Sequence, residues 1–142
     1  MNAEVFLDTN VLLYSVSQLP GEAGKQRIAD MLVTTFSFGT SAQVCQEFYV
    51  IASGKMKHAV TPTTALEFVR KLMSRPFIPT DTELIQSAIE LRQRFQISYW
   101  DAAIIAAAQR LGAKTIYSED LSHGQHYGSV QVVNPFLVAK PA

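Results

Sequence analysis

The chain has 142 residues, of which 48% are hydrophobic and 17% are charged. This length and composition predict one globular domain, spanning residues 1–142, with a hydrophobic core of its own. The 12 basic and 12 acidic residues cancel, which argues against bulk electrostatic capture of nucleic acid but allows a local basic patch or a bound metal ion. The single cysteine, Cys45, excludes an internal disulfide and a multi-cysteine metal site, and we expect it to be buried on a helix.

Three features favour a cytoplasmic protein. No segment approaches the ~18 uninterrupted apolar residues of a membrane-spanning helix. The N-terminal residues lack the basic segment of a secretory signal and lead directly into an apolar run, residues 3–7. A single cysteine also suits a reducing compartment.

Strands and helices alternate along the chain. Apolar runs bounded by turn residues predict strands over residues 3–7, 34–40, 77–78, 114–117 and 130–133. Apolar residues at helical spacing predict helices over residues 10–17, 22–33, 42–53, 62–74, 80–95 and 99–111. The expected N-terminal signals of the last four helices are Ser41, Thr61, Thr80 and Ser98. This alternation predicts an α/β fold with a mostly parallel central sheet and helices on both faces.

The helical spacing also predicts which faces are buried. Residues 102–108 are apolar nearly all round, which indicates a helix enclosed by the domain. In the two preceding helices we expect the following side chains to face the core: Leu66, Val69, Leu72 and Met73, and then Leu84, Ile85, Ala88 and Leu91.

Four carboxylates are placed where they could meet. Asp8 and Asp120 follow two predicted strands, and the carboxyl ends of parallel strands share one edge of a sheet, where ligands bind. Glu47 is the only acid on a helix otherwise free of charge, close to its apolar face, where an unpaired carboxylate is disfavoured. Asp101 lies in the first turn of helix 99–111. We expect helix direction alone not to bring it to this edge, whereas a helix packed across the edge would.

Three of these acids also have an ordinary structural role open to them. Asp8 could be the N-cap of the first helix. Asp101 could be the third residue of a capping box begun by Ser98. Asp120 could be a turn residue. One at a time these readings are sufficient, but the four acids together favour an acidic pocket.

Clustered carboxylates need a cation. Oxygen ligands without a cysteine cluster favour Mg²⁺ or Mn²⁺ over Zn²⁺. Sites of this kind bind phosphates and activate a water molecule for attack on them. Thr9, Asn10 and Ser118 add neutral groups that could hold that water or a phosphate oxygen.

Four motifs resemble the PIN-domain family, and more narrowly the VapC-like toxins of bacterial toxin–antitoxin pairs. They are FLDTNVL at 6–12, QEF at 46–48, YWDAAI at 99–104 and SEDL at 118–121, in the family's order over almost the whole chain. The resemblance implies a three-layer α/β/α sandwich around a parallel sheet. It also implies a ribonuclease whose acids surround one or two Mg²⁺ or Mn²⁺ ions.

The resemblance also implies roles for single residues. It assigns Asp8, Glu47, Asp101 and Asp120 as catalytic, metal-binding acids, and it brings Asp101 into the pocket. Thr9, Asn10 and Ser118 would support them. Glu119 is an additional acid, and whether Glu119 or Asp120 has the larger role in the site stays open. RNA backbone contacts are a weaker expectation, no stronger than an ordinary solvated surface, for Lys55, Lys57, Arg70, Lys71 and Arg75.

Two aromatic residues and two partners complete the expectations. Tyr99 and Trp100 could stack on a base, although packing in the core is favoured. As in related toxins, we expect a homodimer and a cognate antitoxin that blocks the pocket, both using exposed apolar surface on the early helices.

Two rival functions remain open. A phosphatase of the haloacid-dehalogenase type also begins with a strand that ends in aspartate, but its second aspartate position is Asn10 here, and no long cap insertion is present. A PIN-like module that only binds RNA or a protein is the second rival, and the intact acidic set argues against it.

Overall fold

The computed structural model describes residues 2–55 and 60–137, except for the side chain of Lys55. The strands are β1 (Val5–Leu7), β2 (Phe38–Ser41), β3 (Phe77–Ile78), β4 (Thr115–Tyr117), β5 (His126–Tyr127) and β6 (Val130–Val133). The helices are α1 (Thr9–Val16), α2 (Ala23–Thr35), α3 (Ala42–Val50), α4 (Pro62–Ser74), α5 (Thr82–Phe95) and α6 (Tyr99–Arg110). A short 3-10 helix, Pro20–Glu22, precedes α2, and a π-helical turn, Ile51–Lys55, follows α3.

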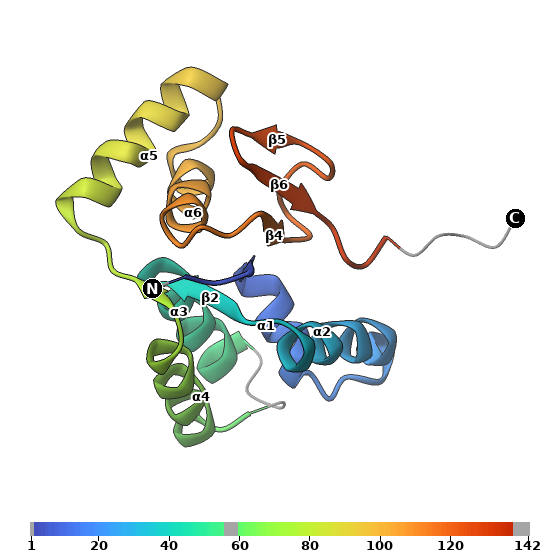
Figure 1. The fold of residues 1–142 in the computed structure, drawn as a ribbon. Coiled ribbons are helices and arrows are strands. Elements are labelled where there is room, and N and C mark those ends of the chain that lie inside the picture. The colour runs from blue at the N-terminus through green and yellow to red at the C-terminus, as the bar shows by residue number, and fades with distance from the viewer. Residues whose placement is uncertain (1, 56–59, 138–142) are drawn as a thin grey trace, which may run out of the picture.

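The strands form one six-stranded sheet in the order β3-β2-β1-β4-β6-β5. Every neighbouring pair is parallel except β5 and β6. Helices α1 to α4 lie on one side of this sheet, and α5 and α6 lie on the other (Figure 1). The predicted α/β sandwich with a mostly parallel sheet is therefore confirmed. No helix in the described part of the chain is long and apolar enough to cross a membrane.

Several predicted boundaries differ from the structure. Helix α2 continues to Thr35, into the predicted strand 34–40, and the Thr34 hydroxyl donates to the Asp30 and Met31 carbonyls of the preceding turn. Strand β2 consequently begins only at Phe38. The N-cap of α5 is Asp81, whose Oδ1 accepts from the Leu84 N–H at 2.9 Å, so the capping box expected from Thr80 is wrong.

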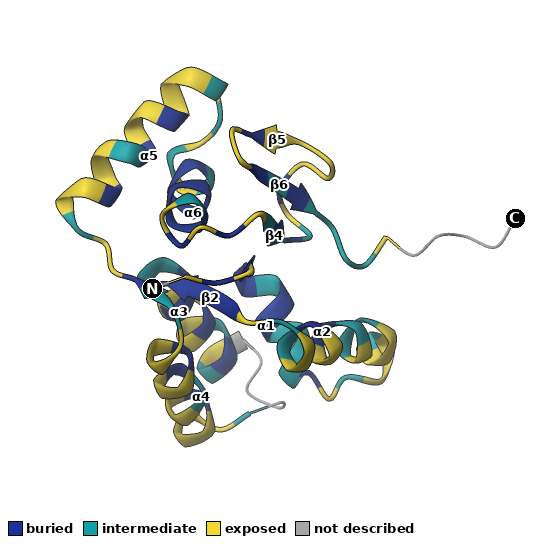
Figure 2. Ribbon diagram, in the orientation of Figure 1, coloured by how far each residue is buried: buried dark blue, intermediate teal, exposed yellow. Residues whose placement is uncertain are grey.

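The core is centred on β1 and α6, as Figure 2 shows by their dark blue ribbons. Residues 102–108 are all buried, and Cys45 is buried on α3, as predicted. Two residues of α4 expected inside are exposed instead: Leu66 is 40% and Met73 47% exposed. The buried stripe of α4 consists of Ala65, Val69 and Leu72, because an outer-layer helix buries only one narrow face. Ile85 on α5 is exposed for the same reason.

The direction of α6 brings its first turn to the carboxyl edge of the sheet. Its C-terminal end lies beside the start of β1, where the Leu111 carbonyl accepts from the Ala3 N–H at 3.0 Å. At its other end, the Trp100 carbonyl accepts from Gln43, in the first turn of α3. The expectation that helix direction would not place Asp101 at this edge is therefore wrong. A helix that leads into a parallel strand must run back from the carboxyl edge to the amino edge.

Candidate active site

Asp8 directly follows β1 and is 8% exposed. Its Oδ1 accepts from the Thr9 N–H at 2.8 Å, so it does cap α1, and its Oδ2 accepts from the Ser118 hydroxyl at 2.7 Å. Burial raises the pKa of Asp8 to about 6. These two hydrogen bonds offset part of that rise, whereas the nearby charges of Glu47 and Asp120 add to it. The Asp8 carboxylate is thus buried among other negative charges.

Ser118 and Asn10 join the end of β1 to the loop that follows β4. The Ser118 hydroxyl, which is fully buried, also accepts from the Asp120 N–H at 3.1 Å. Asn10 accepts from the Glu119 N–H at 3.0 Å and donates to the Asp120 carboxylate at 3.2 Å. These two residues were expected to hold water or phosphate, and in the structure they hold the carboxylates of Asp8 and Asp120.

Glu47 reaches the same edge from α3. Its carboxylate accepts from the Thr9 hydroxyl at 3.0 Å and from the Gln43 side chain at 3.2 Å. Glu47 is exposed, and its spacing from Val44 puts it on the flank of the apolar face of α3, close to that face as expected. Its carboxylate is not unpaired, because Thr9 and Gln43 both donate to it. Gln43 was missed by the sequence analysis, although its position one helical turn before Glu47 is a usable signal.

Asp101 borders this network without joining it. The Ser98 hydroxyl accepts from the Asp101 N–H at 3.1 Å, but within the described residues no hydrogen bond or ion pair engages the Asp101 carboxylate. Only half of the capping box therefore forms. Burial raises the pKa of the Tyr127 phenol, and the negative charge of Asp101 raises it further. The link from Asp101 to Glu47 runs through the backbone of Trp100 and the side chain of Gln43.

Glu119 points away from Asp8. It forms an ion pair with Lys25 of α2, and the Tyr14 hydroxyl donates to it at 2.8 Å. The Lys25 ammonium also lies 4.7 Å from the centroid of the Tyr14 ring and 5.5 Å from that of Phe136. Hydrogen bonds from Lys25 and Tyr14 lower the pKa of the Glu119 carboxyl against the opposing effect of its burial. The charge of Glu119 is therefore already compensated within the chain.

This arrangement predicts different outcomes for the two adjacent acids. For the ribonuclease activity that the sequence resemblance implies, we expect Glu119→Gln to keep cleavage within about threefold of wild type, because the Glu119 charge is already paired with Lys25. We expect Asp120→Asn to lower cleavage by about 100-fold, because it removes a carboxylate beside Asp8. Cleavage rates at saturating Mn²⁺, with circular dichroism as the folding control, decide the matter. Equal losses in both variants would contradict the assignment.

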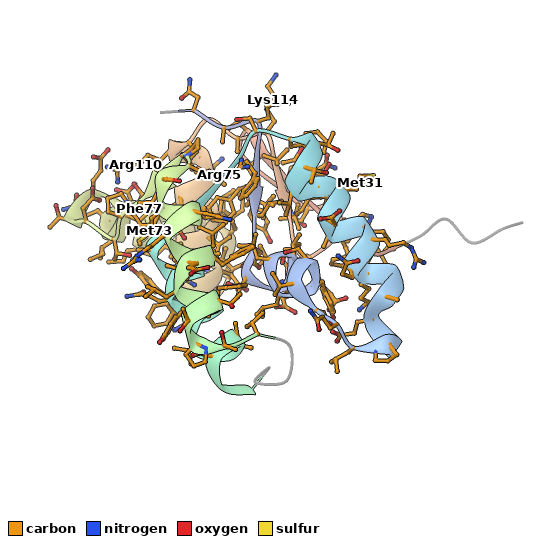
Figure 3. All side chains as sticks on the ribbon, turned by 90° about the horizontal axis from the view of Figure 1, so that it is seen from below. Met31, Met73, Arg75, Phe77, Arg110 and Lys114 are labelled. Atoms are coloured by element: carbon orange, nitrogen blue, oxygen red, sulfur yellow. The ribbon has the colours of Figure 1, made fainter. Side chains whose placement is uncertain are left out.

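Three of the basic residues expected to bind RNA lie away from this edge: Arg70, Lys71 and Arg75. The Arg75 guanidinium lies 4.1 Å from the centroid of the Phe38 ring, at the amino end of β2. Figure 3 shows Arg75 toward the same end of the molecule as Lys114. Arg70 and Lys71 are exposed on the last turns of α4. The remaining two lie outside the described side chains: Lys55 and Lys57.

The donor set suits a hard divalent cation. The four acids supply only oxygen ligands, as Mg²⁺ and Mn²⁺ prefer. Among the described side chains, which do not include that of Lys55, every ion pair lies elsewhere, at Lys25 or Arg110, so none of the lysines or arginines described neutralises Asp8. Within residues 2–55 and 60–137, no three His, Cys, Asp or Glu side chains lie close enough to hold one ion as they are positioned. The site therefore has the ligand chemistry of a metal site, but its carboxylates are not yet close enough together to bind one ion.

Fold and site together define a class: an α/β/α protein whose acidic side chains gather at the carboxyl edge of a parallel sheet. The PIN-domain family model matches residues 5–126, and the chain belongs to that family. No curated protein sequence matches it.

Several solved structures share this fold. One is a chain of a toxin–antitoxin complex from Klebsiella pneumoniae (20% identity, TM-score 0.69, covering 94% of this chain and 99% of that one). Another is FitAcB from Neisseria gonorrhoeae (19% identity, TM-score 0.68, 94% and 99%). A third is a VapC toxin of Mycobacterium tuberculosis described as cleaving the sarcin–ricin loop (17% identity, TM-score 0.63, 82% and 89%).

Proposed function

We propose that this protein is a metal-dependent endoribonuclease. The observation that supports this most is the buried Asp8 carboxylate, which lies near Glu47 and Asp120 and has no cationic partner among the described residues. Burying an uncompensated charge is costly, and a protein that retains one at a ligand-binding edge uses it for binding or chemistry. Membership in the PIN-domain family supports the same function.

Each acid has a role in this proposal. Asp8, Asp101 and Asp120 would hold Mg²⁺ or Mn²⁺, which polarises the scissile phosphate and generates hydroxide from water. Glu47 would be a further ligand or orient the attacking water, since Thr9 and Gln43 fix its carboxylate by hydrogen bonds. The buried Ser118 hydroxyl and the Asn10 amide would keep the carboxylates on the two neighbouring strands aligned.

We further propose that the protein acts in the cytoplasm as the toxin of a toxin–antitoxin pair, as a homodimer neutralised by a cognate antitoxin. Support comes from its likeness to chains of toxin–antitoxin complexes. The exposed apolar surface this requires is present on α3 and α4, which border an apolar groove of about 520 Å³. Its exposed apolar lining residues are Tyr49, Val50, Leu66 and Met73.

The proposal is tested by incubating the purified protein with total bacterial RNA, in Mg²⁺ or Mn²⁺ and in EDTA, and sequencing the new 5′ ends. We expect discrete cuts that require metal and disappear in Asp101→Asn. The matched control is Asp81→Asn, which removes an acid bound to Arg110 outside the pocket and should leave the cuts unchanged. Cuts that persist in Asp101→Asn would contradict the assigned site. A covalent phosphate on Asp8 would support the phosphatase alternative, and metal binding without cleavage would support the binding module.

A further inference from the structure

The most exposed of the large apolar side chains at the candidate active site is Trp100. Its side chain is 66% exposed, so the expectation that it packs in the core is wrong. Its neighbour Tyr99 is only partly exposed and packs against the core, with its ring 5.1 Å from the indole at an interplanar angle of 84°. The indole of Trp100 is thus exposed to solvent and contacts the Tyr99 ring edge to face.

Trp100 is fixed relative to the acids by two contacts of Gln43. The Gln43 amide donates to the Trp100 carbonyl at 3.4 Å and to the Glu47 carboxylate at 3.2 Å. Asp101 is the next residue of the same helical turn. Helical side chains lean toward the N-terminus of their helix, and the N-terminus of α6 lies at the carboxyl edge. The backbone of Trp100 therefore lies at the rim of the acidic site, and its exposed indole projects from there.

The groups around the Trp100 backbone are polar. Its carbonyl accepts from the Gln43 amide, and Asp101 and the Ser98 cap belong to the same helical turn. Trp100 is also absent from the lining of the apolar groove between α3 and α4, whereas a protein interface would be expected to continue into further apolar surface. An exposed indole beside hydrogen-bonding groups instead matches a stacking platform for a nucleobase, which is polar at its edges and apolar on its faces.

We propose that Trp100 stacks on an unpaired base of the RNA, next to the phosphate that the acids act on. The inference rests on the proposed ribonuclease function and specifies the form of its substrate. A base within a duplex has both faces covered, so stacking on an indole requires a single-stranded segment such as a loop or an end. Because every base has an aromatic face, Trp100 selects for unpaired RNA and not for a particular sequence.

The test uses the fact that Trp100 is the only tryptophan of the chain, so its fluorescence reports on this position alone. The background is Asp120→Asn, in which cleavage is expected to be about 100-fold slower while Trp100 and Asp101 are unchanged. In Mg²⁺, we expect a 12-nucleotide single-stranded oligoadenylate to quench the emission with a saturable dependence. The same strand paired to its complement in a blunt duplex should not.

Substitutions then measure the effect on binding. We expect Trp100→Ala to weaken binding of the single strand by about 10-fold or more, which corresponds to the 1–3 kcal/mol of one base–aromatic stack. We expect Trp100→Phe, measured by anisotropy of a labelled strand, to recover part of that loss. Ile89→Ala, which removes an exposed apolar side chain of α5 outside the acidic site and the apolar groove, is the matched control and should bind normally. Thermal unfolding should be nearly the same in all of them, because the removed side chains are exposed.

Each outcome separates this inference from the function on which it rests. Equal quenching by strand and duplex, or binding unaffected in Trp100→Ala while metal-dependent cleavage persists in the wild type, would overturn the stacking role and leave the ribonuclease standing. Quenching by the single strand without any cleavage by the wild type would support stacking and count against the ribonuclease. Emission that changes with protein concentration and not with RNA would assign Trp100 to an interface between protein chains.

Discussion

Asp8→Asn should abolish RNA cleavage and at the same time make the metal-free protein more stable above pH 6. Cleavage should fall by about 100-fold or more, because the variant lacks the most buried carboxylate of the site. Stability should rise because asparagine keeps the shape of the side chain and removes a buried negative charge. An ordinary substitution of a buried, hydrogen-bonded residue would instead lower stability.

The pH dependence of this gain follows from the raised pKa. In the unfolded chain Asp8 ionises near its model value of 3.8, and in the folded protein only at about 6. The folded state therefore binds the proton more tightly, and the stability this gives is complete below pH 4 and lost as the pH rises through 6. Two pKa units correspond to about 3 kcal/mol, which is an upper limit for the gain in Asp8→Asn at pH 8.

Urea denaturation in EDTA at pH 4 and pH 8 checks this result. The free energy of unfolding of the variant should be higher than that of the wild type at pH 8 and no higher at pH 4. Adding Mn²⁺ should then stabilise the wild type, by about 2.7 kcal/mol at 100 times its dissociation constant, and leave the variant unchanged. A variant that is less stable than the wild type at both pH values would mean that the hydrogen bonds from Ser118 and Thr9 outweigh the burial of the charge.

Gly39→Val should strongly destabilise the fold. A Cβ atom at Gly39, in the buried strand β2, would lie 2.6 Å from the Leu111 side chain, 3.0 Å from the Pro76 carbonyl oxygen and 3.2 Å from the Ala3 Cβ. The leucine can rotate away, but the backbone oxygen belongs to the segment that leads into β3 and must move with it. Overpacking of this kind costs about 3 kcal/mol, at the upper end of its usual range.

Chemical denaturation measures this loss directly. Gly21→Ala is the control, because a Cβ there meets nothing within 4 Å, and its free energy of unfolding should stay within about 0.5 kcal/mol of wild type. If Gly39→Val unfolds at the same denaturant concentration as Gly21→Ala, the close approach of α6 and the β3 segment to β2 is not as tight as described.

Several features of this protein were determined by short-range sequence patterns. The apolar run that ends in Asp8, the residues 102–108 of α6 and the caps Ser41, Thr61 and Ser98 all depend on neighbours within one or two turns. The alternation of strands and helices then predicts a parallel sheet, and with it a shared edge for Asp8 and Asp120. The hydrogen bonds through Asn10 join exactly these two strand ends.

The tertiary structure alone decided how the polar side chains at that edge are partnered. Glu119 and Asp120 are adjacent and chemically alike, yet a lysine 94 positions away in the chain, Lys25, binds only the first. Trp100 and Tyr99 are equally aromatic, but only Tyr99 packs against the core. Local spacing fixes which way a side chain leaves its helix or strand. Whether it meets water, a cation or another side chain depends on segments that only folding brings together.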